Sequence, residues 1–105
     1  MVEAKDIGLS ETQLQELLLC FEAFPEIEEV LLFGSRALGN YKSGSDIDLA
    51  LMGAQCSSDT IYDLLISLNQ RFLYKFDVVH FETLQNQALA THIKEYGKVI
   101  YKRKT

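Results

Sequence analysis

Residues 30–51 read VLLFGSRALGNYKSGSDIDLAL, in which two short apolar runs flank a polar segment punctuated by glycines. The first run, 30–33, predicts a strand that ends at Gly34-Ser35, and the second predicts a strand over 46–51. One or two helical turns fit residues 35–38 between them, and the remainder of the connection is loop. A parallel crossover needs a dozen or more residues, usually with a helix, so this short connection favours a mixed sheet over an all-parallel one.

Helical and extended patterns alternate on both sides of this segment. Residues 10–24 predict a helix, because Ser10 and Gln13 have capping-box spacing, leucines recur on one face and Pro25 ends the pattern. A second long helix is predicted to begin at residues 57–59. Further along, the pattern predicts a strand over 76–81, a helix over 83–96 and an edge strand over 99–101. We therefore expect an α/β (α+β) fold, a small mixed sheet of three to four strands with helices packed on it.

Length and composition narrow the class of protein. The chain has 105 residues, enough for a single domain over residues 1–105. Hydrophobic residues make up 48% and charged residues 24%, the balance of a soluble globular protein. Six glycines, one proline and two cysteines exclude collagen, disordered tails and disulfide miniproteins. No apolar run approaches the roughly 18 residues of a membrane span and no signal peptide opens the chain, so we expect a cytoplasmic protein with Cys20 and Cys56 as reduced thiols.

The formal net charge of −5 is unevenly spread. Residues 1–30 contain eight acids and one base, whereas residues 98–105 contain four bases and no acid. Proteins that bind nucleic acid through its phosphates usually present a basic face, so we expect no direct, stable nucleic-acid binding. The basic tail is either an electrostatic contact or, more commonly for a terminus, solvated and frayed. His80 and His92 lack a second His or Cys at ligand spacing, which favours structural or surface roles.

Gly34-Ser35 lies where a predicted strand ends and a short predicted helix begins. Free backbone N–H groups at a helix N-terminus favour phosphate. Glycine lets a phosphate approach the backbone closely, and the Ser35 hydroxyl is a further donor. The same pair is common in tight strand-to-helix turns for purely geometric reasons, so alone it is a weak indication of a binding site.

Asp46 and Asp48 are separated by one residue of a predicted strand. Both carboxylates are therefore expected on one face, with Cβ atoms about 6 to 7 Å apart from a rise of about 3.3 Å per residue. Two such anions repel each other, and a divalent cation removes the repulsion. Oxygen ligands indicate Mg²⁺ or Mn²⁺ shared with substrate phosphates. Capping of the preceding loop is the alternative, and it explains Asp46 better than Asp48.

Asp77 interrupts the apolar run over residues 76–81. An unpaired carboxylate in a central strand costs several kcal/mol, so it must meet a cation, a metal ion or water. The alternatives are a salt bridge with Lys75 or Arg71, or an edge-strand position that faces solvent. With the turn and the paired aspartates, Asp77 makes phosphoryl-type chemistry the leading interpretation. Two metal ions about 3.5 to 4 Å apart can hold a triphosphate and activate the attacking oxygen.

Gly34-Ser35, ten residues and then Asp46-x-Asp48 resemble the signature of the DNA polymerase β-like nucleotidyltransferase superfamily. The sequences at 33–39 and 45–49, and the segment 93–101, resemble its minimal branch, the MNT domains. The resemblance covers essentially the whole chain. It implies a polymerase β palm-like nucleotidyltransferase fold and metal-dependent transfer of a nucleotide to a hydroxyl.

The resemblance also implies how the phosphates would be bound. Gly34 and Ser35 would hold the β- and γ-phosphates of ATP, and Arg36 would contact the triphosphate. Leu38 departs from the family pattern, because related sequences often carry Arg or Lys there. With leucine at this position the chain lacks that positive charge near the phosphates, which would weaken nucleotide affinity.

The same resemblance implies the catalytic residues. Asp46 and Asp48 would bind two Mg²⁺ ions, with Mn²⁺ as an alternative. Asp77, the third carboxylate, would bind the catalytic metal and help to deprotonate the acceptor hydroxyl.

MNT domains are commonly encoded with a helical HEPN protein, and the pair resembles a toxin–antitoxin system. By this resemblance the chain is an MntA-type antitoxin that transfers AMP from ATP to a tyrosine of the HEPN ribonuclease and silences it. We expect the acceptor site to come from such a partner, encoded nearby, or from a second copy in a homo-oligomer. The acidic N-terminal third complements a basic partner. The alternatives are a small-molecule acceptor and a non-catalytic nucleotide- or partner-binding module, against which the three carboxylates argue.

Overall fold

The computed structural model describes residues 2–104, which form a four-stranded sheet in the order β3-β2-β1-β4. Its strands are β1 (Glu29–Phe33), β2 (Ile47–Met52), β3 (Phe76–His80) and β4 (Lys98–Lys102). β1 runs antiparallel to both β2 and β4, whereas β3 runs parallel to β2. The predicted mixed sheet is therefore confirmed, and β3 and β4 are its two edges.

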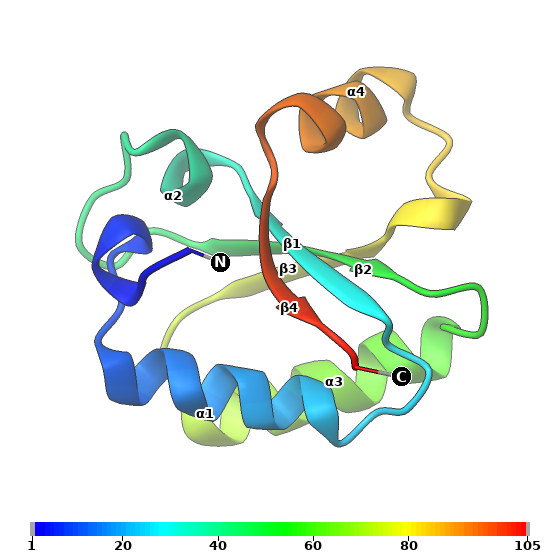
Figure 1. Ribbon diagram of the computed structural model, residues 1–105, viewed down its shortest axis with the longest axis horizontal. Helices are drawn as coiled ribbons and strands as arrows, with labels where there is room; N and C mark the ends of the chain where they lie inside the picture. The colour runs from blue at the N-terminus through cyan, green and yellow to red at the C-terminus, as the bar shows by residue number, and fades with distance from the viewer. Residues whose placement is uncertain (1, 105) are drawn as a thin grey trace.

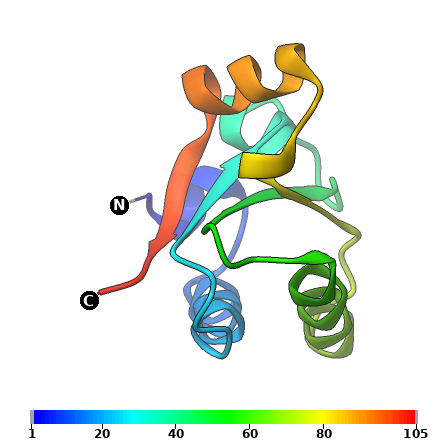
Figure 2. The same ribbon diagram turned by 90° about the vertical axis from the view of Figure 1, so that its right-hand side faces the viewer.

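Two long helices cover one face of the sheet (Figures 1 and 2). α1 (Glu11–Glu22) and α3 (Ser58–Arg71) lie side by side on that face, whereas α4 (Gln87–Tyr96) lies on the opposite one. α2 (Ser35–Leu38) is a single turn that follows β1 directly. Residues 2–104 also form two 3₁₀ turns: η1 (Ala4–Ile7) precedes α1, and η2 (Phe81–Thr83) follows β3.

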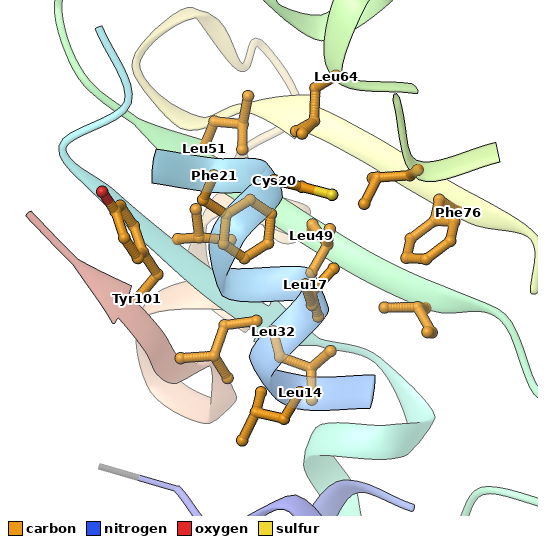
Figure 3. Close-up of a cluster of buried hydrophobic side chains, with 14 of the residues drawn as sticks. Leu14, Leu17, Cys20, Phe21, Leu32, Leu49, Leu51, Leu64, Phe76 and Tyr101 are labelled. Carbon is orange, nitrogen blue, oxygen red and sulfur yellow. The ribbon is translucent and has the colours of Figure 1, made fainter. Parts of the chain in front are cut away.

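The main core lies between the sheet and the two long helices (Figure 3). Side chains alternate along β2, so Leu49 and Leu51 point into this core and are fully buried. Leu17 and Phe21 of α1 pack in the same cluster from the helix side. Asp48, which lies between inward-facing residues of β2, consequently projects from the face of the sheet on which α4 lies.

Local signals set most of the helix boundaries. Ser10 Oγ accepts a hydrogen bond from the Gln13 N–H at 3.0 Å, and the Ser10 N–H donates to Gln13 Oε1 at 2.9 Å, as the capping box predicts. Ser57 caps α3 in the same way. The last helix begins later than predicted, because Phe81–Thr83 form a 3₁₀ turn and Asn86 caps α4. No pattern in the sequence predicts η1.

Within residues 2–104, no helix combines the length and the apolar character that crossing a bilayer requires.

Both cysteines are buried free thiols, as expected for reduced residues. Cys20 packs in the main core between α1 and the sheet. Cys56 lies after β2, and its Sγ donates weakly to Glu26 O at 3.4 Å. Burial, together with the charges of nearby glutamates, raises the pKa of the Cys56 thiol to about 11, so this thiol is unreactive at neutral pH.

Candidate active site

The Gly34-Ser35 turn and the Asp48 carboxylate lie directly against each other. Phe33, the last residue of β1, is the cross-strand partner of Asp48 in β2, so the turn that follows Phe33 passes beside this side chain. Gly34 has φ 77° and ψ −155°, a combination that essentially only glycine adopts. A Cβ atom added to Gly34 would overlap Asp48 Oδ2. The structure thus brings together the first two features that the sequence analysis identified.

Asp77 lies beside Asp48 on the same face of the sheet. The two residues are register partners in the parallel β2–β3 pair, so their side chains project in the same direction. β3 is an edge strand and Asp77 is exposed, which is the solvent-facing alternative, so the cost expected for a central strand does not arise. Within residues 2–104, neither Lys75 nor Arg71 forms a salt bridge with Asp77.

Negative charge is concentrated around Asp48. Its pKa is raised from an ordinary 3.8 to about 6, first by partial burial and next by Asp77, through both its charge and a side-chain hydrogen bond. Asp46, which is exposed just before β2, raises this pKa further, whereas His92 lowers it. A carboxylate whose charge is disfavoured in this way, as that of Asp48 is, would be stabilised by a bound cation.

The donor set fits magnesium better than a softer metal, because Asp46, Asp48 and Asp77 offer only carboxylate oxygens. In the part of the chain that the structure describes, no group of three or more His, Cys, Asp or Glu side chains is placed to hold a metal ion by itself. Mg²⁺ needs no such cage, since it is usually held by one or two carboxylates together with substrate phosphates. The arrangement therefore fits an ion that is shared with a nucleotide.

α2 presents the start of a helical turn to the same place. The Leu38 N–H donates to Gly34 O at 3.1 Å and the Gly39 N–H donates to Ser35 O at 3.0 Å, which closes the turn. The first N–H groups of a helix have no acceptor within it, and the half-buried Ser35 lies among them. These donors are suited to a phosphate, next to the carboxylates that would share its metal ion.

Arg36 is buried, and its side chain is bound to backbone carbonyls. Its side chain is only 2% exposed, and its guanidinium donates hydrogen bonds to the backbone carbonyls of Ile7, Gly8 and Ser45. All three guanidinium nitrogens are engaged in these bonds, so the structure gives no support to the expected contact of Arg36 with the triphosphate. Leu38, at the end of α2, is 49% exposed.

α4 adds a residue to the site that the sequence interpretation missed. His92 packs edge-on against Phe33, with ring centroids 6.3 Å apart, and Phe33 is the cross-strand partner of Asp48. Tyr96, one helical turn further on, has its ring centroid 5.4 Å from that of His92 and is 51% exposed. The four-residue spacing of His92 and Tyr96 is visible in the sequence, but the packing of α4 against the end of β1 is not.

His80 has the structural role that the sequence analysis expected. Its Nε2 lies 2.9 Å from Gly53 O and 3.1 Å from Glu82 Oε1, and Glu82 Oε2 accepts a hydrogen bond from the Gly53 N–H at 2.9 Å. These contacts join the end of β3 to the turn after β2. They lie at the opposite end of β2 from Asp48 and take no part in the candidate site.

The sequence is similar to those of known nucleotidyltransferases. Residues 15–105 match the family described as polymerase beta, nucleotidyltransferase. A protein of Methanocaldococcus jannaschii (strain ATCC 43067), named "Putative protein adenylyltransferase MJ0604", is 31% identical over 84 residues, which cover 71% of this chain and 79% of that protein.

Solved structures share the fold. A toxin–antitoxin crystal structure with AMP-PNP gives a TM-score of 0.70 at 24% identity, over 91% of this chain and 76% of that chain. A complex of the tri-AMPylated Shewanella oneidensis HEPN toxin with MNT antitoxin gives a TM-score of 0.62 at 21% identity, over 89% of this chain and 70% of that chain. At these identities the two structures establish the fold of this chain, which is the one that the sequence predicts.

Proposed function

This chain belongs to the polymerase beta nucleotidyltransferase family, and on that premise we propose that it transfers AMP from ATP to a hydroxyl group of a partner protein. The observation that carries the proposal is the contact of the Gly34-Ser35 turn with Asp48, beside Asp77. Nucleotidyl transfer needs a phosphate-binding turn next to paired carboxylates. The metal ions that the carboxylates hold must lie close to both the triphosphate and the attacking oxygen. The name of the M. jannaschii relative supports AMP as the transferred group and a protein as its acceptor.

In the proposed reaction the turn at α2 binds the phosphates, and the aspartates on and before the two strands β2 and β3 serve the transfer itself. The N–H groups of the turn and the Ser35 hydroxyl bind the β- and γ-phosphates. The acceptor oxygen attacks the α-phosphorus, a new phosphorus–oxygen bond forms as the bond to the bridging oxygen breaks, and pyrophosphate leaves. The hydroxyl proton passes to Asp77, whose exposure makes it accessible to an acceptor.

Asp46, Asp48 and Asp77 would hold two Mg²⁺ ions, for which Mn²⁺ can substitute. When bound, these ions neutralise phosphate charge and make the acceptor hydroxyl more acidic. The chain itself fixes the position of Asp48, which is half-buried against the Gly34 backbone. Asp46 and Asp77 are both exposed, so they remain free to adjust to the nucleotide and to the acceptor.

The acceptor that we favour is a tyrosine of a helical HEPN-type protein encoded nearby. The chain would then act in the cytoplasm as an MNT antitoxin, with residues 1–105 as one minimal nucleotidyltransferase domain. The support comes from the compared structures, of which one is a toxin–antitoxin with AMP-PNP and another contains a tri-AMPylated HEPN toxin. The segment 1–30, with eight acids and one base, is suited to a basic partner.

A transfer assay with the neighbouring gene product tests this function. The purified chain is incubated with Mg²⁺, the helical protein encoded beside it and each nucleoside triphosphate labelled at the α-phosphate, and the label is located by peptide mass spectrometry. We expect AMP on a tyrosine of the partner, absent with Asp48→Asn and unchanged with the surface variant Asp63→Asn of α3. Label on a small molecule, or ATP binding without any transfer, would contradict the proposal.

A further inference from the structure

Arg36 is a buried cation whose side-chain hydrogen bonds end on backbone carbonyls. Its Nε and Nη2 donate to Ser45 O at 3.2 and 2.9 Å, and its Nη1 donates to Ile7 O at 2.9 Å and to Gly8 O at 3.2 Å. A buried guanidinium is tolerated only when its N–H groups are satisfied. Neutral carbonyls satisfy them here, because within residues 2–104 no Asp or Glu forms an ion pair with Arg36.

One edge of this guanidinium holds the peptide unit that leads into Asp46. Nε and Nη2 both donate to Ser45 O, and the nitrogen of that peptide unit belongs to Asp46. Two donors in a rigid planar fork fix the direction of a carbonyl more strictly than a single flexible donor does. The orientation of the backbone from which Asp46 projects therefore depends on Arg36.

Aromatic rings bring the guanidinium into contact with the segment before β3. Arg36 Cζ lies 4.9 Å from the ring centroid of Tyr74 and 5.4 Å from that of Tyr41. Tyr74 precedes β3, the strand of Asp77, and the carbonyl of the next residue, Lys75, accepts a hydrogen bond at 2.9 Å from the first residue of β2. Arg36 thus lies where the segments leading into β2 and β3 meet.

The N-terminal segment leaves room for this arrangement at Gly8. Its φ is 75°, and a Cβ atom added there would lie 2.6 Å from a ring carbon of Tyr41 and 2.8 Å from Arg36 Nη1. A glycine at this position therefore lets η1 close over the guanidinium.

We propose that Arg36 is a positioning residue, which holds the approaches to Asp46 and Asp77 in a fixed relation to the Gly34-Ser35 turn. Arg36 itself belongs to α2, whose first residue is Ser35, so one side chain connects the three segments that carry the candidate site. It makes no contact with substrate and acts through the backbone before Asp46. The inference rests on the proposed function, because the site that Arg36 orders is the nucleotide site.

Arg103 provides a matched control for this role. Like Arg36 it donates to backbone carbonyls, with Nε to Ile27 O at 2.9 Å and Nη2 to Phe24 O at 2.7 Å. These contacts lie beyond the Glu29 end of β1, whereas Gly34 follows the other end of that strand. Substitution of Arg103 therefore loosens the fold without touching the segment before Asp46.

The experiment compares Arg36→Lys with Arg103→Lys at a temperature at which both are folded by circular dichroism. Lysine keeps the charge but has one nitrogen, which cannot reproduce the fork. For Arg36→Lys we expect faster amide hydrogen exchange over residues 42–48. We also expect the Mg²⁺ concentration for half-maximal ATP binding, measured by calorimetry, to rise about tenfold, the scale on which loss of an outer-shell group acts. For Arg103→Lys we expect a lower Tm with both site readouts unchanged.

Equal effects of the two substitutions on exchange and on the Mg²⁺ midpoint would overturn the proposal and leave Arg36 a residue of the fold alone. If Arg36→Lys does not fold, Gly8→Ala displaces the guanidinium without removing it, and unchanged exchange over residues 42–48 in that variant would also overturn it. A wild-type chain that binds no ATP would instead overturn the proposed function. The exchange comparison between the two lysine variants would then still decide the positioning role.

Discussion

At Gly34 the backbone passes so close to the Asp48 carboxylate that no side chain fits between them. Gly34→Ala is therefore expected to displace Asp48 and to strain a backbone with φ 77°. We expect the free energy of unfolding to fall by about 2 kcal/mol and ATP binding to be lost, as measured by urea unfolding and by calorimetry.

Gly39 supplies the control, since its φ is 84° but nothing lies within 4 Å of an added Cβ. Gly39→Ala should cost about 1 kcal/mol of backbone strain and leave ATP affinity unchanged. Equal loss of ATP affinity in both variants would show that backbone strain, and not the contact with Asp48, explains the effect of Gly34→Ala.

The raised pKa of Asp48 makes the stability of the fold depend on pH. The pKa is about 6 in the folded protein against an ordinary 3.8, so between these values the folded state keeps a proton that the unfolded chain has released. Stability from this group is therefore lost as the pH rises from about 4 to about 6. Asp48→Asn has no carboxyl to lose a proton there, so its free energy of unfolding should rise relative to that of wild type by about 1 kcal/mol between pH 4 and pH 7. The figure is small because solvent screens a half-buried carboxyl.

Chemical denaturation of wild type and variant at the two pH values measures this difference. Asp63→Asn, on the exposed face of α3, should show no such change between pH 4 and pH 7. If Asp48→Asn is stabilised relative to wild type more at pH 4 than at pH 7, the result would contradict the electrostatic account of the site.

Residue placement could be predicted where spacing alone determines geometry. The turn at Gly34-Ser35 and the strand that carries Asp48 could be predicted from local pattern, and the family signature implied that they belong to one site. Their contact itself depends on the antiparallel register of β1 with β2, in which Phe33 faces Asp48. The direction of the Arg36 side chain is not local, since it depends on carbonyls from η1 and from the loop before β2. His92 was missed for the same reason: its place beside Phe33 depends on where α4 packs.

Asp77 lies on the exposed edge strand β3 beside Asp48, and in the proposed reaction it acts on the acceptor hydroxyl and not on the nucleotide. Asp77→Asn should leave MgATP affinity within a few-fold of wild type, while single-turnover transfer falls by roughly 10², the scale of a lost acid–base group. Calorimetry and a quenched transfer assay on the same preparation measure the two effects. Joint loss of binding and transfer would make Asp77 a binding residue, and undiminished transfer would remove it from the site.

α2 ends in an exposed leucine, at a position where a cation would lie close to the phosphates that its first turn is proposed to bind. Leu38→Arg should therefore tighten ATP binding, by about threefold to fivefold for a partly solvated pair worth up to about 1 kcal/mol. The gain should shrink as salt is added. Leu19→Arg on α1, where Leu19 is 60% exposed, changes net charge equally and should leave affinity unchanged, so equal gains in the two variants would point to a general charge effect.

Helices and strands could be predicted where the sequence pattern that determines them lies within the element itself. A capping box and apolar periodicity predict α1, a second long helix is predicted from residues 57–59, and short apolar runs predict the four strands. The start of α4 was placed too early because the 3₁₀ turn Phe81–Thr83 continues an apparently helical pattern. The edge position of β3 could not be predicted from its own residues, since a parallel pairing between β2 and β3 is set by the packing of α3.

For the molecule as a whole, the proposed function predicts a stable complex with the helical protein encoded beside it. We expect the two chains, produced together, to elute as one species in size-exclusion chromatography with light scattering, with an interface of about 1,200 Å² or more in total. Because the acids of residues 1–30 are expected to face a basic partner, added salt should slow association. Separate elution of the two chains would remove the support for a HEPN-type partner.

The place of β4 in the sheet has a consequence for synthesis on the ribosome. Along the chain β4 follows the other three strands of the sheet, yet it pairs with β1, and the Arg103 N–H then donates to Glu28 O at 2.8 Å. Until residues 98–102 leave the exit tunnel, the apolar run Val30 to Phe33 therefore has one open hydrogen-bonding edge, of the kind that recruits other strands. Closing a loop of this length is slow relative to local pairing. Before β4 is made, that edge of β1 is therefore open to pairing with strands of other chains.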